Sequence, residues 1–129
     1  MSNWEEYGLL PLRIALGIVF IYHGYLKLFG GQFPNEFFGS LGIPLPYVFA
    51  IIVSVLEFFG GIALVLGLLT RYTGLLLSIN MLVAILLVHL PNGFLVTQGG
   101  MEFPLALLGG ALTLAMMGSG KLSVDDYMS

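Results

Sequence analysis

The chain has 129 residues, of which 58% are hydrophobic and only 9% charged, and its formal net charge is −3. A water-soluble domain carries roughly 25% charged residues, so these few charges exclude an ordinary soluble globule. Its four scattered basic residues exclude a nucleic-acid-binding surface, and the absence of cysteine excludes disulfides and thiolate metal sites within the chain.

Four apolar stretches approach the length of about 20 residues that a membrane-spanning helix needs. They cover residues 9–29, 47–69, 72–90 and 102–117, the last at the short end of the range. Residues 30–46 form the longest connection and are expected to lie partly in the membrane interface. Thr70 and Arg71 are expected to form a tight polar turn between the second and third spans.

Short links between successive spans predict an antiparallel, up-and-down bundle. Arg13, Arg71 and Lys121 fall on one side of the predicted membrane and Lys27 alone is nearer the other, so the positive-inside rule places the first side in the cytoplasm. The sequence therefore predicts an all-α, integral membrane four-helix bundle. We expect one domain over residues 1–129, with both termini on the cytoplasmic side.

Small residues recur four positions apart inside the predicted spans. The pairs are Ala50 and Ser54, Ala63 and Gly67, Gly74 and Ser78, and Ala106 and Gly110. Such pairs let helix backbones approach closely in lipid. Glycine and alanine are also common in membrane helices by chance, so the pattern predicts close packing in general and no particular contact.

Several ionisable residues fall inside or at the edges of the spans, where charge is expensive and commonly functional. They are Arg13, His23, Lys27, Glu57, His89 and Glu102. At a rise of about 1.5 Å per residue, His23 and Glu57 lie at similar depth near mid-membrane. Lys27 shares a helix face with His23, and we predict that these three residues form a cluster. His89 and Glu102 are expected to lie above it, nearer the outer face.

Each of these residues also has a structural interpretation. Glu57 cannot snorkel from mid-span, but a bond to a histidine or to the backbone would make it a structural lock. Arg13 is expected to snorkel to the cytoplasmic surface, and Lys27 can snorkel outward. His89 and Glu102 can be ordinary groups at a loop edge, and Glu102 suits the first turn of a helix electrostatically. For the pair of Glu57 and His23, the functional and the structural interpretation both stay open.

Two further residue patterns bear on chemistry. No single predicted helix carries a His-x-x-x-His or Glu-x-x-His pair, so no metal site is predicted. Asn80, midway along the third span, is expected to make a hydrogen bond between helices.

A set of short motifs extends over nearly the whole chain. They are RIALG at 13–17, HG at 23–24, KL at 27–28, GIP at 42–44, Glu57 with GG at 60–61, LGLLTR at 66–71, Met81, His89, NGF at 92–94, GGME at 99–102 and GSGKLSVD at 118–125. In this order and spacing they resemble the DoxX family of small bacterial and archaeal membrane proteins. The resemblance implies a protein integral to the prokaryotic cytoplasmic membrane. That family takes its name from a subunit resembling part of an archaeal thiosulfate:quinone oxidoreductase, and other members look like partners of redox-defence enzymes.

The resemblance implies a bound quinone and redox-enzyme partners, either soluble or in the membrane. Quinone reduction needs an apolar pocket and acid groups that deliver protons to the ring oxygens. Glu57, His23 and Lys27 are the catalytic candidates for that chemistry. The substrate-binding candidates are His89, Glu102, Phe20, Phe58 and Asn80. Phe20 and Phe58 are expected to pack near the quinone ring, although aromatic residues at helical spacing more often belong to the hydrophobic core.

Three functions remain open. The first is a membrane subunit of an oxidoreductase complex that binds a quinone. The second is a small transporter or proton-pathway subunit, which the lack of proline in the span interiors disfavours. The third is a non-catalytic membrane anchor that recruits soluble redox enzymes. The lipid bilayer is a partner in all three, nucleic acid in none, and each is compatible with a homo-oligomer.

Overall fold

The computed structural model describes residues 3–129, and over that range the chain is helical with no strand. The elements are α1 (Asn3–Glu6), α2 (Leu9–Phe29), α3 (Asn35–Ser40), α4 (Pro46–Leu66), α5 (Thr70–Ala84), η1 (Ile85–His89), η2 (Leu90–Asn92), η3 (Val96–Gln98), α6 (Glu102–Met117) and α7 (Val124–Met128). Three helical stretches, Trp4–Phe29, Pro46–Leu66 and Thr70–Asn92, are long and apolar enough to cross a membrane. The 16-residue α6 is apolar but shorter.

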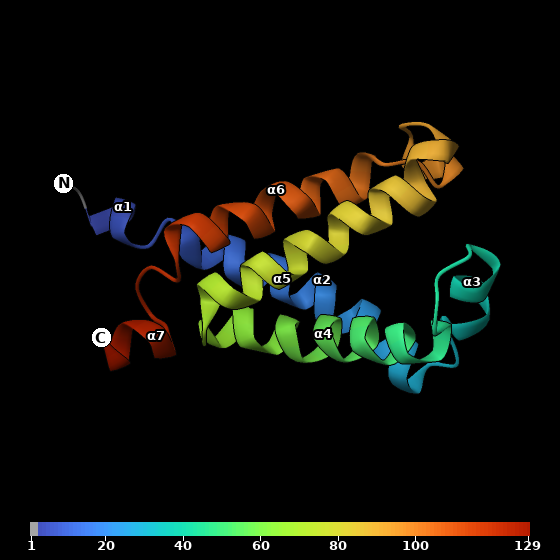
Figure 1. Ribbon diagram of the computed structural model, residues 1–129. Coiled ribbons are helices and arrows are strands. Elements are labelled where there is room, and N and C mark those ends of the chain that lie inside the picture. Colours follow the sequence, from blue (N-terminus) through green and yellow to red (C-terminus); the bar gives the residue numbers. More distant parts are fainter. Residues whose placement is uncertain (1–2) are drawn as a thin grey trace.

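The long helices form two pairs, α2 with α4 and α5 with α6 (Figure 1). Both ends of the described chain, with α1 and α7, lie at one end of the bundle, and α3 lies at the other (Figure 1). The predicted bounds of 9–29 and 102–117 are confirmed by α2 and α6. The connection at 30–46 contains α3, which packs against α4.

The turn between α4 and α5 lies earlier than predicted. α4 ends at Leu66, because Gly67 adopts the left-handed conformation with φ of 68°. Leu69 is also left-handed, with φ of 48°, a conformation that is costly for leucine. Thr70 and Arg71 therefore belong to the first turn of α5, and the prediction that they form the connecting turn is wrong.

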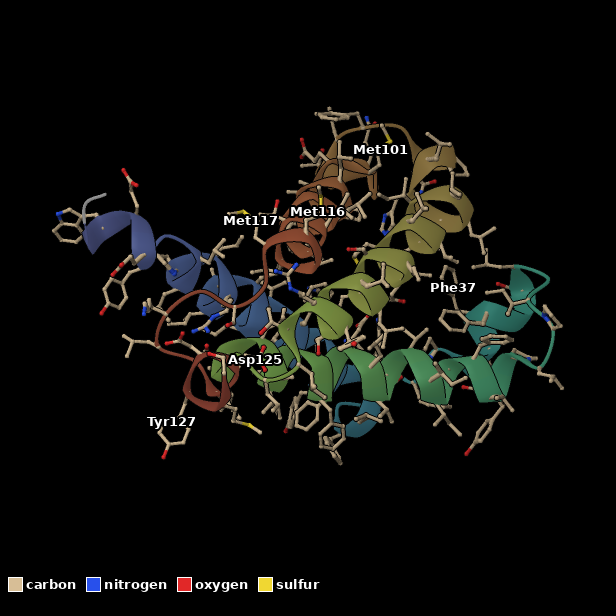
Figure 2. The ribbon with its side chains drawn as sticks, turned by 60° about the vertical axis from the view of Figure 1, so that its left-hand side comes forward. Phe37, Met101, Met116, Met117, Asp125 and Tyr127 are labelled. Carbon is tan, nitrogen blue, oxygen red and sulfur yellow. The ribbon has the colours of Figure 1, made fainter. Side chains whose placement is uncertain are left out.

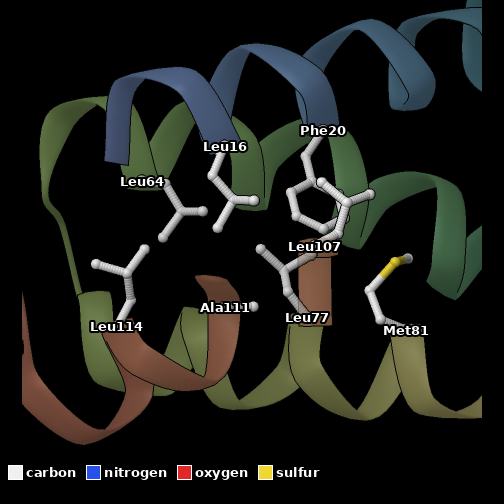
Figure 3. Packing of buried hydrophobic residues seen from close by; sticks show 8 residues of the cluster. All are labelled: Leu16, Phe20, Leu64, Leu77, Met81, Leu107, Ala111 and Leu114. Carbon is white, nitrogen blue, oxygen red and sulfur yellow. The ribbon is translucent and has the colours of Figure 1, made fainter. Parts of the chain in front are cut away.

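The core is a layer of apolar side chains to which α2, α4, α5 and α6 all contribute (Figure 3). Its buried members are Leu16, Phe20, Leu64, Leu77, Met81, Leu107, Ala111 and Leu114. Buried area here is shared among four helices, so the shorter α6 is an integral part of the bundle. Large apolar side chains on the outward faces are exposed, as in a helix bundle that meets lipid.

Glycines let the backbones of the paired helices touch. A Cβ added to Gly61 on α4 would lie 2.6 Å from the carbonyl oxygen of Gly17 on α2, and one added to Gly24 would meet the backbone of Phe58. A Cβ added to Gly74 on α5 would lie 2.8 Å from the carbonyl oxygen of Ala111 on α6. Close packing at small residues was predicted in general, and Gly74 is the predicted position that makes such a contact most clearly.

Arg13 does not snorkel to the surface, and that prediction is wrong. The side chain is fully buried, with 0% exposure. Its Nη2 donates a hydrogen bond to the carbonyl oxygen of Leu122, at 2.8 Å. The C-terminal segment, residues 118–129, folds back over the bundle and brings this acceptor to the guanidinium. The pattern of apolar spans alone does not reveal this contact.

Asp125 fastens the same segment to the start of α5. Its carboxylate accepts hydrogen bonds from the backbone N–H groups of Leu69, at 2.7 Å, and Thr70, at 2.8 Å. Its own N–H donates to the carbonyl oxygen of Gly67, at 2.9 Å. Partial burial opposes ionisation, but the two backbone N–H groups and the positive charge of Arg13 outweigh it. The pKa of Asp125 therefore lies below its ordinary value.

We expect Asp125→Asn to lower the free energy of unfolding by about 1 kcal/mol near neutral pH, as for the loss of a helix N-cap. The folded-state pKa lies below the unfolded value of about 3.9. The carboxylate therefore stabilises the fold above about pH 4, and this contribution is lost as the pH falls through the folded-state pKa.

The check is the unfolding midpoint in detergent micelles, followed from neutral pH down to about pH 3. Asp126→Asn is the matched control, because the Asp126 carboxylate makes no hydrogen bond within residues 3–129. If Asp125→Asn and Asp126→Asn have the same unfolding midpoints across this pH range, Asp125 does not stabilise the packing of the C-terminal segment against α5.

Candidate functional site

A cavity of about 550 Å³ lies between α3, α4 and α5. Most of its wall is apolar, and its polar groups come from Lys27, Glu57, Asn80 and His89. Figure 2 shows Phe37 on the α3 side of this region, with Asp125 and Tyr127 at the opposite end of the molecule. The cavity is thus at the far end of the bundle from the two termini.

Helical periodicity sets the cavity wall. Phe49, Val53 and Glu57 are spaced four apart on α4 and therefore lie on one face. On α5, Asn80 and Ala84 repeat the same spacing across the cavity. Each helix thus presents a stripe that is apolar along most of its length and carries one polar residue, Glu57 or Asn80.

The third span departs from α-helical geometry beside the cavity. Residues 85–89 form the π-helical turn η1, shortly before Pro91. A proline ring clashes with the carbonyl of the residue four positions earlier in an α-helix, and a wider turn relieves that clash. Leu87, Val88 and His89 all line the cavity, and single π turns inside helices are frequently found at functional sites.

Glu57 is the centre of the polar end. Its side chain is only 4% exposed. Nζ of Lys27 lies 2.6 Å from Oε1, and Nδ2 of Asn80 donates to Oε2 at 2.8 Å. Both carboxylate oxygens are therefore held, one from α2 and one from α5. The prediction that Asn80 bonds between helices is confirmed.

The predicted cluster forms only in part. Lys27 pairs with Glu57, whereas His23 makes no hydrogen bond to it. The His23 ring instead lies 6.2 Å from the ring of Tyr22 and 6.1 Å from the ring of Phe103, measured between centroids. Similar depth brings His23 near Glu57, but its direction around α2 turns it toward α6. Lys27, one turn further along α2, takes the position beside the carboxylate.

His89 and Glu102, the two residues expected above the cluster, lie in different parts of the structure. His89 lines the cavity, and its Nδ1 lies 2.9 Å from the carbonyl oxygen of Gly99. Glu102 does not line the cavity. Its Oε1 accepts a hydrogen bond from the backbone N–H of Val96 at 2.8 Å, which fastens the loop ahead of α6. The expectation that Glu102 lies over the cluster is therefore wrong, because the carboxylate turns to its own loop.

The predicted aromatic residues do not line the cavity. Phe20 is a core residue with 1% exposure, and Phe58 packs against Phe29 and Phe59. The aromatic wall comes from Phe37, Phe38 and Phe49, none of which is among the predicted site residues. Phe49 could have been found from its spacing of eight residues before Glu57. No sequence signal places α3 over α4.

Within residues 3–129, no group of three or more His, Asp or Glu side chains is placed to hold a metal ion. The chemistry available in the cavity is that of one carboxylate, one ammonium group, one amide and one imidazole. These groups can donate and accept hydrogen bonds and move protons. The apolar remainder of the wall suits a ligand that partitions into lipid.

The comparison with known families agrees with the motifs. The DoxX family model matches residues 8–90, a range that contains the paired residues Lys27 and Glu57 as well as Asn80. The chain belongs to the DoxX family. No solved structure matches it.

Among curated relatives, this DoxX protein is 37% identical over 128 residues to "Putative oxidoreductase CatD" of Bacillus subtilis (strain 168), covering 99% of this chain and 92% of the relative. It is 33% identical to the inner membrane protein YqjF of Escherichia coli (strain K12), over 100% of this chain and 98% of the relative. It is also 33% identical to the E. coli inner membrane protein YphA, over 91% of this chain and 87% of the relative. The DoxX protein is therefore integral to the prokaryotic cytoplasmic membrane.

Proposed function

We propose that this DoxX protein is a membrane subunit of an oxidoreductase complex and binds a quinone or a similar lipid-soluble carrier in the cavity. The observation that carries the proposal is the buried carboxylate of Glu57, held at the polar end of an apolar cavity. The name of the relative CatD also supports a redox role. We propose further that residues 1–129 act as one domain.

The wall fits such a ligand. A volume of about 550 Å³ lies within the usual range for small-molecule sites. Phe37, Phe38 and Phe49 offer flat apolar surfaces for a ring, and Lys27 and Asn80 offer N–H donors for a ring oxygen. A bound quinone would accept electrons and protons, the electrons coming from a partner redox enzyme.

In this proposal, residues of this chain donate the protons that the quinone takes up. Nζ of Lys27 donates a short hydrogen bond to Glu57. Lys27 can therefore give one proton to a ring oxygen of the quinone while the Glu57 carboxylate keeps Nζ in position. Asn80 keeps the carboxylate oriented. His23, four residues before Lys27 on the same helix, is proposed to resupply the pair, and His89 to contact the ligand at the other end of the cavity.

We infer that α6 is a fourth span and that both termini face the cytoplasm. The 16 residues of α6 extend about 24 Å, slightly less than the hydrocarbon thickness. The chain ends lie at one end of the bundle (Figure 1), where Arg71 and Lys121 also gather, and cytoplasmic ends are rich in basic residues. The cavity then lies in the outer half of the membrane.

The test is binding of a labelled short-chain quinone to the purified protein in lipid nanodiscs. Phe49→Ala and Asn80→Leu should each weaken binding about tenfold, since each removes a proposed ligand contact, a ring face or an N–H donor, in the range of 1–3 kcal/mol. Phe59→Ala is the matched control, because Phe59 lies on α4 but is 56% exposed outside the cavity. Equal binding by all three variants and wild type would overturn the proposal.

A proton pathway is the second candidate, favoured by the π-helical turn η1 beside the cavity. Irregular helices line many transport sites. Proton uptake by reconstituted vesicles that requires Glu57 but no quinone would favour this function over the first.

A further inference from the structure

A second hollow, of about 500 Å³, lies at the end of the bundle that holds both chain ends. Its wall is built by α1, the start of α5, the end of α6 and the C-terminal segment. The backbone N–H of Lys121 donates to the carbonyl oxygen of Glu6, which joins the C-terminal segment to α1. This hollow is separate from the cavity at Glu57 and shares no lining residue with it.

Charges of both signs line the hollow without pairing with one another. Arg71 and Lys121 are the cations, and Glu6 and Asp126 are carboxylates whose oxygens accept no hydrogen bond within residues 3–129. In that part of the chain, the ion pair between Lys27 and Glu57 is the only one. Asp125 also lines the hollow, but its carboxylate is occupied by the start of α5.

Arg71 is fixed in place. Its Nη1 donates to the carbonyl oxygen of Met116 at 2.6 Å, and its Nη2 lies 3.4 Å from that of Met117. These contacts hold the guanidinium at the C-terminal end of α6, where the helix dipole favours a cation. Its remaining N–H groups are free to meet an anion in the hollow.

The hollow also has an apolar rim, which we define as Leu69, Tyr72 and Met117. These side chains are 59%, 71% and 62% exposed. They stand where α5 begins and α6 ends, at the boundary between apolar spans and the polar chain ends. A ligand here would have its polar part in the hollow and its apolar part along the rim.

We propose that this hollow binds the headgroup of a zwitterionic phospholipid with a primary amine, phosphatidylethanolamine. Arg71 and Lys121 receive the phosphate, while Asp126 and Glu6 accept hydrogen bonds from the ammonium group. The acyl chains lie along the apolar rim. An anionic headgroup would face two uncompensated carboxylates, and a quaternary amine has no N–H to donate to them.

The test is native mass spectrometry of the delipidated protein in detergent. It is titrated separately with phosphatidylethanolamine, phosphatidylcholine and phosphatidylglycerol of identical acyl chains, and with soluble phosphoethanolamine. Wild type should retain one phosphatidylethanolamine with about tenfold preference over the other lipids and over the soluble headgroup. Arg71→Gln should weaken the binding of every lipid, and the double variant Glu6→Gln/Asp126→Asn should remove the preference over phosphatidylcholine.

Glu36→Gln is the matched control, because Glu36 lies on α3 at the far end of the bundle. It should bind as wild type does. Equal retention of the three lipids by wild type, or a preference that survives Glu6→Gln/Asp126→Asn, would overturn the proposal. Soluble phosphoethanolamine that binds as tightly as the lipid would overturn the lipid as its source. None of these results depends on quinone binding.

Discussion

Lys27→Met is expected to destabilise the fold by about 3 kcal/mol or more, because it leaves the buried Glu57 carboxylate without its cation. The apolar stem is replaced at similar length, so the change removes charge far more than packing. Asn80 alone cannot compensate a charge inside an apolar bundle. The measurement is the unfolding midpoint in detergent micelles.

The double variant Lys27→Met/Glu57→Gln provides the control. A neutral amide needs no cation, so the double variant should recover most of the lost stability. If it is as unstable as Lys27→Met, the loss comes from packing of the lysine stem and not from the buried charge. Recovery of stability without recovery of quinone binding would separate the structural role of the pair from its proposed functional role.

Gly24→Ala is expected to cost about 1–3 kcal/mol, although alanine is the better helix former by about 1 kcal/mol. The added Cβ would meet the backbone of Phe58, which cannot move without separating α2 from α4. Unfolding in detergent micelles measures the cost.

Gly109→Ala is the matched control for this substitution. Gly109 is also inside a helix, but an added Cβ there meets nothing within 4 Å. The control should therefore be neutral or slightly stabilising. Equal effects of the two substitutions would show that α2 and α4 do not touch at Gly24.

Hydropathy predicted the positions of the apolar helices because long apolar runs are bounded here by glycine and proline. It could not place the start of α5. That start is fixed by Asp125, which lies 55 residues from Thr70 in the chain. Arg13 was misjudged for a related reason, since its acceptor on Leu122 is 109 residues away. Contacts of this separation leave no local pattern.

Only part of the site could be predicted, because helix rise gives the depth of a residue in the membrane but not the direction of its side chain around the helix. Depth paired Glu57 with His23, and Lys27 joined the predicted cluster only because it shares a helix face with His23. The position of Asn80 midway along its span correctly marked it as a residue that bonds between helices. Depth could not tell that His23 turns toward Phe103. The aromatic wall from α3 was missed because a short helix in a connection can fold over any neighbouring span.

Photolabelling with an azidoquinone in native-like membranes tests whether the cavity at Glu57 holds a lipid-soluble redox carrier. The labelled peptides are identified by mass spectrometry, with unlabelled quinone as competitor. If the cavity binds the quinone, labelling that the competitor suppresses is confined to α3, to residues 49–57 and to residues 80–89. Labelling spread over the exposed faces of all the long helices, and unaffected by the competitor, would contradict quinone binding in the cavity.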